Sequence, residues 1–559
     1  MSQIEKNVDT DLYSRQIGAF GMEIMRKMLK MKVLIVGMRG LGIETAKNII
    51  LSGCDSVDIY DPSLVKINDL GSNFYLSEED VDKKNRDEVS KLKLSSLNPE
   101  VRVSVLKLNS QKNTKEFIDE FCEKIPNYNI IVFTEVQSKD FLIRVNEECR
   151  KKDVKFIYGV CFGLTGAIFT DFGPNHVIID SNGKEIKNYY IKSINKDKEG
   201  KVTIDTIQDT EKLEMGNGDY VKFKNVGGMI ELNDREFQVT VEDKDSFKIG
   251  DTTKFGDYTK GGIVYRIKKP KTVICEDYKK RSEIMLDSNS QLYNSDFTKI
   301  GRQLLLFITL GQIQEYFSSH DFTLPELNNV NQANEIAEQV KKKYEEIKSK
   351  KDNGYKNLIE FDEKIVINTI RWSSAHLCPI TAFFGGILAQ EIIKSNGQYI
   401  PINQWLIFDF LEVAENIKED ADRTLKNSRY DEQIAIFGNE IQQKLEKSNF
   451  FMVGAGATGC EYLKNFALMG ASSTKDSKFV VTDNDNIEIS NLSRQFLFKK
   501  EDVGKPKAEV AKNSTKVMNP NFNVGAMQDK VCAETENIFN EDFWENQSFI
   551  IFAVDSLEA

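Results

Sequence analysis

The stretches VLIVGMRGLG (33–42) and FFMVGAGATG (450–459) each place a short apolar run directly before a glycine-rich turn. The residues after each turn, IETAKNIILSG (43–53) and CEYLKNFALMG (460–470), have helical spacing. A strand, a glycine turn and a helix in this order begin a βαβ mononucleotide unit. The glycines let a phosphate approach the backbone at the helix N-terminus, where unpaired N–H groups attract an anion. The sequence therefore predicts an α/β fold with two such units.

The two stretches belong to a longer repeat. YSRQIGAFG (13–21) precedes the first turn and YDEQIAIFG (430–438) precedes the second, at the same separation of 417 residues that relates the turns themselves. NDLGSNFYLSEEDV (68–81) then parallels SNLSRQFLFKKEDV (490–503) at a separation of 422 residues. Preserved order and spacing indicate two copies of one unit rather than chance similarity.

The two copies differ at the glycine turn. Gly456 in the second copy matches Arg39 in the first, where a long side chain fills the space that a phosphate needs. Asp555, after the apolar run SFIIFAV, matches Val136, so the first copy lacks this carboxylate. We therefore expect phosphate chemistry in the second copy only.

Two cations also distinguish the copies. At the separation of 422 residues, Arg494 matches Ser72 and Lys507 matches Asn85, so both cations are expected only in the second copy. Together with Asp483, near the end of the next strand, they suit a triphosphate, because charge that develops on phosphoryl oxygens needs fixed cations. The accompanying magnesium needs a carboxylate. The glycine motif alone also fits a nicotinamide-dependent oxidoreductase, which these cations disfavour.

The composition limits the class of partner. The 559 residues include 75 Lys and Arg against 86 Asp and Glu, and this net charge of −11 argues against duplex DNA or an anionic membrane. No apolar run approaches the roughly 20 residues that span a bilayer, and the N-terminus lacks a signal-peptide pattern. Eight scattered cysteines without a C-x-x-C pair predict neither a disulfide framework nor a cysteine zinc site. We expect a soluble intracellular protein with no nucleic-acid and no membrane partner.

The region between the copies changes pattern twice. Short alternating stretches from residue 175 to 268, separated by Asn-Gly and Glu-Gly turns, predict an all-β insert. Helical periodicity from 269 to 358, as in FTKIGRQLLLFITLGQIQEYF (297–317), predicts a helical-bundle insert. The chain then returns to the first copy with TAFFGGILAQEIIK (381–394), an apolar helix rich in small residues that we expect to pack tightly between the copies.

The long motifs together resemble one family. LYSRQIGAFG (12–21), NSRYDEQIAIFG (427–438), TDNDNIEISNLSRQFLF (482–498) and P-x-x-x-W-x-x-F-D (401–409) occur in the order found in the N-terminal half of eukaryotic single-chain ubiquitin-activating enzymes. The resemblance runs from about Asp11 to the last residue. It implies two Rossmann-like adenylation units of the ThiF/MoeB type, the first degenerate and the second active but truncated.

The resemblance also implies a division into domains. It assigns 1–174 and 359–425 to the inactive adenylation domain and 175–268 to the all-β insert, which is similar to a first half-domain of the catalytic-cysteine region. It assigns 269–358 to the helical bundle and 426–559 to the N-terminal portion of the active adenylation domain. Since both copies lie in one chain, we expect a monomer with an internal pseudo-dimer.

By this resemblance, the chain activates ubiquitin or a ubiquitin-like modifier. The C-terminal carboxylate of the modifier attacks the α-phosphate of ATP, with Mg²⁺ as cofactor, and gives an acyl-adenylate and pyrophosphate. The complete enzyme then forms a thioester on a cysteine and passes the modifier to a ubiquitin-conjugating enzyme. Physical chemistry agrees with the first step, because cations must offset the repulsion between a carboxylate and a polyphosphate. The carboxylate is already ionised at pH 7, so no general base is needed.

The same motifs imply the site residues. The resemblance gives the catalytic roles to Arg15, Arg494, Lys507 and Asp555, with Asp555 as the metal-linked carboxylate. Arg15 resembles the arginine that reaches across the pseudo-dimer, like an arginine finger worth about 10³ to 10⁵ in rate. Asp483 holds the ribose. The residues implied in nucleotide binding are Gly454, Gly456, Ala457, Gly459, Asp483, Asn491, Arg494, Gln495, Lys507, Asp555 and Ser556.

The chain departs from the family pattern near its last residue. VDSLEA (554–559) stands where the family usually has Asp-Asn-x-Asp-Ala-Arg, with Ser556 for Asn and Glu558 for Asp, and Thr458 replaces Ile in the loop. In the family, the catalytic-cysteine domain and the rest of the active sheet follow this point, so we expect a fragment. We expect the fragment alone neither to form a thioester nor to turn over ATP efficiently.

Other functions stay open beside ubiquitin activation. One is a non-catalytic scaffold or truncated pseudoenzyme that binds a ubiquitin-like modifier. Another is activation of a different ubiquitin-like protein, because the motifs do not identify the modifier. For each of them we expect a location in the cytoplasm and nucleus.

Overall fold

The computed structural model describes residues 8–110, 114–184, 186–205, 213–286, 299, 301–349 and 360–555. The chain divides into two compact units. The first unit comprises Met1–Pro174, Ile274–Asn396 and Pro401–Ala559, and the second comprises Asn175–Val273 and Gly397–Ile400. The first unit contains both glycine turns and is described first.

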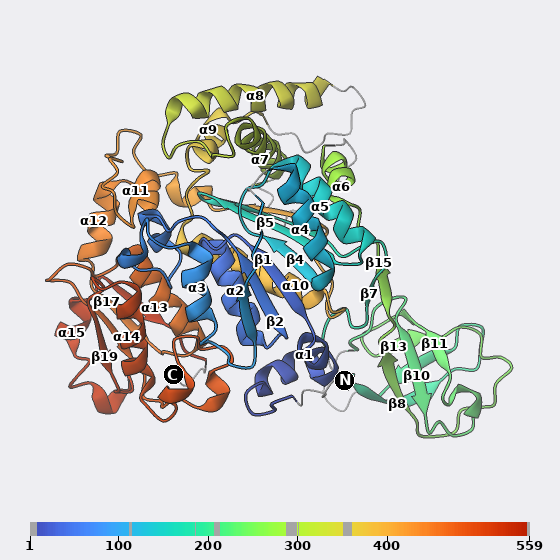
Figure 1. The fold of residues 1–559 in the computed structure, drawn as a ribbon. Helices are drawn as coiled ribbons and strands as arrows, with labels where there is room; N and C mark the ends of the chain where they lie inside the picture. Colours follow the sequence, from blue (N-terminus) through green and yellow to red (C-terminus); the bar gives the residue numbers. More distant parts are fainter. Residues whose placement is uncertain are drawn as a thin grey trace, which may run out of the picture. The chain divides into compact units, whose positions relative to one another are not determined.

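A seven-stranded mixed sheet forms the centre of the first copy (Figure 1). Its strands are β1 (Lys32–Val36), β2 (Ser56–Tyr60), β3 (Arg102–Val105), β4 (Ile130–Phe133), β5 (Lys155–Phe162), β6 (Thr165–Asp171) and β16 (Trp405–Asp409). The order is β16-β6-β5-β4-β1-β2-β3, and β3, β2, β1, β4 and β5 are parallel to one another. At one edge, β6 pairs antiparallel with β5, and β16 pairs antiparallel with β6. This parallel order is Rossmann-like.

Among the helices around the first sheet, two pack closely against each other. The helices are α1 (Ser14–Met28), α2 (Gly40–Ser52), α3 (Arg86–Leu94), α4 (Lys115–Lys124), α5 (Lys139–Lys151) and α10 (Cys378–Lys394). Helix α2 is buried almost all round, because α10 covers the side that does not face the sheet. A Cβ at Gly385 of α10 would lie 2.5 Å from Glu44 Cβ, so glycine permits this approach.

In the chain order, a group of helices with its own core separates the two parts of the first copy. Its helices are α6 (Tyr278–Met285), α7 (Arg302–Ser319), α8 (Val330–Ser349) and α9 (Glu363–Arg371). The buried positions of α8 recur every three or four residues, as expected for an amphipathic helix. They meet apolar residues of α7 and α9 in a core that includes Leu304, Ile308, Val340, Tyr344 and Ile370.

The second copy has a smaller sheet of the same design (Figure 1). Its strands β17 (Phe450–Val453), β18 (Phe479–Thr482), β19 (Val524–Met527) and β20 (Phe549–Phe552) are all parallel, in the order β19-β18-β17-β20. This order repeats that of β3-β2-β1-β4. The helices are α11 (Asp431–Phe437), α12 (Asn439–Lys447), α13 (Ala457–Met469), α14 (Lys507–Met518) and α15 (Glu541–Glu545).

Matching glycines of the two copies have similar backbone conformations. Gly37 after β1 has φ +101° and Gly454 after β17 has φ +100°, a conformation that L side chains rarely adopt. Gly21 interrupts α1 at φ +79° and Gly438 separates α11 from α12 at φ +85°. The chain therefore makes the same turns at the same places in the repeat.

The second unit is rich in β-structure. Strands β8 (Asn188–Ile194), β9 (Lys201–Ile204), β10 (Tyr220–Lys224), β11 (Glu236–Gln238), β12 (Thr240–Val241), β13 (Ser246–Lys248) and β14 (Ile263–Ile267) form one antiparallel sheet in the order β11-β10-β14-β8-β9-β13-β12. Strand β7 (His176–Ile178) pairs with β15 (Lys271–Val273), so strand structure continues past residue 268. Val202, Val221, Phe223, Phe247 and Val264 are fully buried in its core.

A group of charges, buried except for the partly exposed Glu461, joins the two copies within the first unit. Lys464 of α13 contacts Glu44 of α2, and Lys47 of α2 contacts Glu461 of α13. Each lysine also pairs with the glutamate of its own helix, Lys47 with Glu44 at 2.8 Å and Lys464 with Glu461 at 2.6 Å. The lysine side chains are at most 1% exposed. Corresponding residues of the two copies therefore contact one another symmetrically.

This group makes stability depend on acid pH. Burial opposes ionisation of Glu461, but Lys464 and Lys47 outweigh it and lower its pKa from 4.5 to about 2. A depressed carboxyl pKa stabilises the folded state above the unfolded pKa, and this stabilisation is lost as the pH falls from about 4.5 toward 2. We expect Glu461→Gln to flatten that part of a curve of unfolding free energy against pH. The surface variant Glu501→Gln should leave the curve as it is, and equal curves for all three proteins would contradict the prediction.

Candidate nucleotide-binding site

The glycine turn of the second copy leaves open space before α13. Gly456, the N-cap of α13, has φ −71° and ψ −158°, close to φ −73° and ψ −168° at Arg39 in the first copy. Its backbone conformation therefore does not require glycine. A Cβ added at Gly456 would meet none of the described residues within 4 Å, so the absent side chain leaves room in front of the loop.

The first turn of α13 is suited to an anion. It has no side-chain cap and no acidic residue. Gly454, Gly456 and Ala457 are half-buried and Thr458 is exposed, whereas Gly459 is buried against the turn. The first N–H groups of the helix, which have no partner within it, thus begin at an accessible loop, where a phosphate is favoured.

Asp483 at the end of β18 is held by the loop itself. Its Oδ2 accepts the backbone N–H of Ala455 at 2.6 Å, and its Oδ1 accepts the N–H of Asp485 at 2.9 Å. Asp61 in the first copy accepts the N–H of Met38 at 2.9 Å in the same way. Asp483 remains half-buried beside the open loop, where its carboxylate can accept hydroxyl groups of a ribose.

The structure brings Arg15 and Asp555 close enough to Arg494 for their charges to act on it. Burial lowers the pKa of Arg494, the charge of Arg15 lowers it further, and Asp555 opposes both effects. Gln16, the neighbour of Arg15 on α1, donates from Nε2 to the carbonyl of Ser493 at 3.3 Å. The beginning of α1 in the first copy therefore reaches the loop of the second copy that carries Arg494.

Lys507 and Arg494 have different hydrogen-bond partners. Lys507, the first residue of α14, is 8% exposed and donates from Nζ to Asp485 at 2.7 Å. The side chain of Asp485 is 63% exposed, so this ion pair is partly in solvent. Arg494 donates from Nη1 to the carbonyl of Ser490 at 2.7 Å, which leaves its other guanidinium nitrogen atoms available for a ligand.

The remaining predicted residues have differing surroundings. Asn491 is buried and its Oδ1 accepts the N–H of Glu488 at 3.0 Å, which fixes the loop. Gln495 is 3% exposed, and its Oε1 has no hydrogen-bond partner among the described residues. Ser556 lies outside the described residues.

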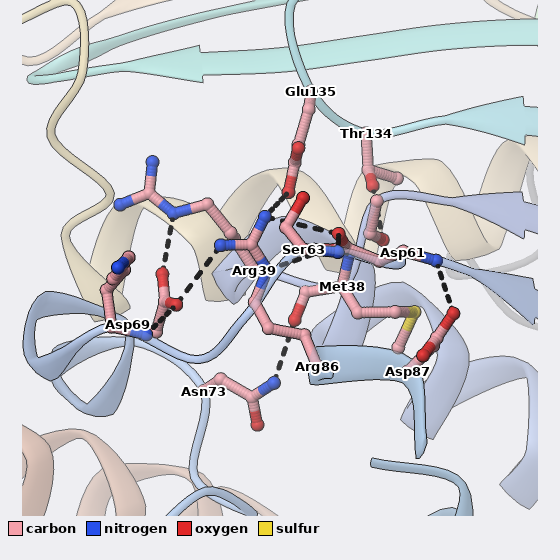
Figure 2. A network of polar contacts seen from close by, with 12 residues as sticks. Met38, Arg39, Asp61, Ser63, Asp69, Asn73, Arg86, Asp87, Thr134 and Glu135 are labelled. Atoms are coloured by element: carbon pink, nitrogen blue, oxygen red, sulfur yellow. Dashed lines mark hydrogen bonds and ion pairs between the residues drawn. The ribbon is translucent and has the colours of Figure 1, made fainter. Parts of the chain in front are cut away.

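The equivalent place in the first copy is filled by side chains (Figure 2). Arg39 donates from Nε to Asp69 at 3.0 Å, and Arg86 donates to Asp61 at 2.7 Å and to Asp69 at 3.1 Å. Glu135 lies 3.6 Å from Arg86. Burial would lower the pKa of Arg86, but these carboxylates raise it well above its usual value. The ion pairs replace the open space found at Gly456.

The second copy contributes one of these side chains. Glu432 of α11 pairs with Arg39 and accepts the backbone N–H of His376 at 2.8 Å. Glu432 and Arg15 are 417 residues apart, so they occupy the same position in the repeat. Each copy thus extends one side chain toward the other's site, and the second site receives a cation whereas the first receives a carboxylate.

The charges of the first site oppose phosphate binding. Its carboxylates outnumber its cations, since two arginines, Arg39 and Arg86, face four acidic residues. A polyphosphate entering this place would be repelled and would have to break buried ion pairs. The acidic residues are Asp61, Asp69, Glu135 and Glu432.

The structure corrects the expectation that both cations are confined to the second copy. Arg86 N–H donates to the carbonyl of Ser63 just as Lys507 N–H donates to that of Asp485, and each residue begins a helix. Lys507 therefore matches Arg86 and not Asn85. The first copy has one extra residue in the turn before its helix, which shifts the register from 422 to 421.

Sequence comparison also missed the roles of two acidic residues. Glu135 lies one position before Val136, so a comparison at fixed separation passes over it. Glu432 stands within the motif YDEQIAIFG, where its alignment with Arg15 shows an exchange of charge between the copies. This exchange of charge in the sequence could have indicated that Glu432 contacts Arg39.

The residues present fit ATP with Mg²⁺. The open loop at Gly456, the cations Arg15, Arg494 and Lys507, and the unpaired Oε1 of Gln495 offer partners for phosphates and polar groups. In the described ranges, no cluster of three or more His, Cys, Asp or Glu side chains could hold a metal alone. Mg²⁺ with a nucleotide needs only one or two carboxylates, because phosphates and water complete its shell.

Within the same ranges, no helix has the length and apolarity to cross a membrane.

Comparison with known proteins gives consistent results. The model of the ThiF family matches residues 13–426 and 430–559. Ubiquitin-activating enzyme E1 2 of Triticum aestivum is 39% identical over 99% of this chain and 51% of its own length. Ubiquitin-like modifier-activating enzyme 1 of Homo sapiens is 36% identical over 99% of this chain and 50% of its own length. The chain thus spans about half the length of the curated relatives it matches.

A solved structure of E. coli MccB with succinimide is also similar in part. It is 24% identical and covers 29% of this chain and 48% of its own chain, with a TM-score of 0.26. A TM-score this low carries no conclusion about the fold.

Proposed function

Because this chain belongs to the ThiF family, we propose that its second copy takes part in the ATP-dependent adenylation of the C-terminal carboxylate of ubiquitin or a ubiquitin-like modifier. The names of the relatives support ubiquitin as the modifier. The single observation that carries the proposal is the contrast between the copies. The loop at Gly456 is open, whereas the matching place in the first copy is filled by Arg39 and its carboxylate partners.

The proposed chemistry is transfer of an adenylyl group to a carboxylate. The modifier carboxylate attacks the α-phosphate of ATP, the bond from the α-phosphorus to the bridging oxygen breaks, and pyrophosphate leaves. Arg494 and Lys507 offset the negative charge of the phosphates, and Arg15 adds a cation from the other copy. Holding both reactants in line supplies much of the acceleration. The attacking carboxylate is already ionised at pH 7, so the reaction needs no general base.

Asp555 and Asp483 have separate tasks in this proposal. Asp555 would hold Mg²⁺, which supplies charge neutralisation on the phosphate oxygens when bound. Asp483, oriented by the N–H groups of Ala455 and Asp485, would accept the ribose hydroxyls. Asn491 and Gln495 would line the nucleotide pocket.

The wider assignments are proposals of the same kind. We propose that the two sheets are an inactive and an active adenylation unit paired within a monomer, with the β-rich unit and the helical cluster inserted between parts of the first. Thioester formation on a cysteine and transfer to a ubiquitin-conjugating enzyme would need regions that the relatives have outside the matched half. We place this activity in the cytoplasm and nucleus.

The proposal is tested by modifier-dependent exchange of pyrophosphate into ATP in the full-length protein. We expect Arg494→Gln and Lys507→Gln each to lower the exchange rate by about 10² to 10³, the loss typical when one group that stabilises charge in the transition state is removed. Lys505→Gln is a matched control, because Lys505 is two residues away and pairs with Asp502 at the surface. Normal exchange in the Arg494 and Lys507 variants would contradict the proposal.

A scaffold without catalysis is the competing function. It is favoured by one observation, the departure of Ser556 and Glu558 from the family pattern beside Asp555. An active site raises the melting temperature when ATP binds, since a ligand of the folded state stabilises it. A melting temperature of the full-length protein that ATP leaves unchanged, with modifier binding retained, would support the scaffold.

A further inference from the structure

A polar cavity lies along α9, and none of its lining residues belongs to the proposed nucleotide site. Its volume is about 210 Å³, and its walls include Lys364, Asn368, Arg371 and Trp372, with Arg423 from the segment that leads to the second copy. Lys364, Asn368 and Trp372 recur at intervals of four residues and so share one helical face. A water molecule takes about 30 Å³ in the liquid, so a tetrahedral oxyanion fits this volume.

The two arginines of the cavity keep their charge. Arg371 donates from Nη2 to Asn328 Oδ1 at 3.2 Å, which is a neutral acceptor. The guanidinium of Arg423 donates to four backbone carbonyls, which satisfy its hydrogen bonds but supply no negative charge. The acceptors are those of Lys418 at 3.1 Å, Glu419 at 3.0 Å, Ala421 at 3.3 Å and Ile436 at 3.4 Å.

Carboxylates compensate little of this charge. Among the described residues, the ion pair recorded for the cavity joins Lys364 to Glu419 at 3.7 Å, and the side chain of Glu419 is 89% exposed. Three cations therefore face one carboxylate that lies largely in solvent. The C-terminal dipole of α9 offsets part of the charge of Arg371, but it gives no acceptor to the rest of the group.

Two of the residues that line the cavity also carry a buried donor without an acceptor among the described residues. Arg371 Nε and Trp372 Nε1 are inaccessible to solvent and have no hydrogen-bond partner among the described residues. Trp372 is 5% exposed. Burial lowers the pKa of Arg371, and the nearby charge of Arg423 lowers it further, as expected for two cations held together without an anion. Arginine charges that face a cavity without a carboxylate partner favour a ligand that carries negative charge.

We propose that this cavity binds a phosphate-sized oxyanion, inorganic phosphate or pyrophosphate, between Arg371, Arg423 and Lys364. The oxyanion supplies the negative charge that the described carboxylates do not, and it accepts hydrogen bonds from the Arg371 guanidinium and the Lys364 ammonium. It connects α9 to the segment before the second copy, since its partners come from both. This site is additional to the proposed function, because it shares no residue with the nucleotide site.

The test must separate this cavity from the nucleotide site, which also attracts phosphate. We therefore use Gly456→Arg as the background, since an arginine at that position fills the nucleotide loop. Binding of inorganic phosphate, pyrophosphate and sulfate is measured by calorimetry at constant ionic strength. Arg371→Gln is added to remove the cavity charge. Arg281→Gln is the matched control, because Arg281 is also half-buried and donates to a neutral carbonyl, that of Asn403 at 3.3 Å.

We expect one phosphate or pyrophosphate to bind per chain in the Gly456→Arg background. Loss of a charge-assisted contact weakens this binding about 10- to 100-fold in the added Arg371→Gln variant. Arg281→Gln should leave the affinity unchanged, and the relative affinities of the three anions identify the preferred one. Absence of binding in the Gly456→Arg background, or equal affinity with and without Arg371→Gln, would overturn the proposal. Neither result bears on ATP binding by the unsubstituted protein.

Discussion

Replacing Lys464 with methionine is expected to lower the free energy of unfolding by about 3 to 5 kcal/mol. Lys464 is fully buried between Glu44 and Glu461, so its removal leaves two carboxylates to share the single cation of Lys47. The uncompensated buried charge accounts for most of the loss. Denaturant unfolding measures it from the shift in midpoint at unchanged slope.

Two variants test whether this loss comes from buried charge. Lys444→Met removes a lysine that pairs with Glu440 at the surface of α12, where both side chains are more than 70% exposed, and we expect a change below about 1 kcal/mol. Adding Glu44→Met to Lys464→Met removes the surplus carboxylate and should recover part of the stability. A loss for Lys464→Met no greater than that for Lys444→Met would contradict this interpretation.

Much of the fold could be predicted from the repeat. The strands before Gly37 and Gly454 and the helices after them are local features, and the sequence marks them by apolar runs, glycine and helical spacing. The buried charges between the copies left a signal as well. Glu44 and Lys47 recur as Glu461 and Lys464 in otherwise apolar helices, where a charge needs a partner.

The sequence predicted only in part that side chains fill the first site. Arg39 in place of glycine was visible, but its partners come from distant segments, Asp69 and Glu432, which a linear comparison does not bring together. A single extra residue before α3 also displaced Arg86 from its true counterpart, Lys507. Hydrogen bonds of the backbone were needed to find that shift.

Replacing Gly456 with arginine is expected to weaken ATP binding strongly while the protein stays folded. The backbone at Gly456 already has the conformation that Arg39 adopts, and a Cβ there meets none of the described residues. The guanidinium then occupies the space of the phosphates. Loss of two or more charge-assisted contacts lowers ATP affinity by on the order of 10³. The affinity is measured by calorimetry, and the melting temperature reports folding.

Gly456→Ala serves as the control for this substitution. A methyl group points into open space and leaves the cations Arg494 and Lys507 in place, so ATP affinity should fall much less than with arginine. The reverse change, Arg39→Gly, should not create a second site, because the carboxylates Asp69, Glu135 and Glu432 remain. Equal affinities for Gly456→Arg and the unsubstituted protein would show that phosphates bind elsewhere.

The stoichiometry of ATP binding tests the contrast between the two copies most directly. With a titration of ATP and Mg²⁺ into the protein, we predict one nucleotide per chain, lost in Gly456→Arg and retained in Arg39→Gly. Two nucleotides per chain, or one nucleotide that survives Gly456→Arg and disappears when Arg39 is replaced, would contradict the account.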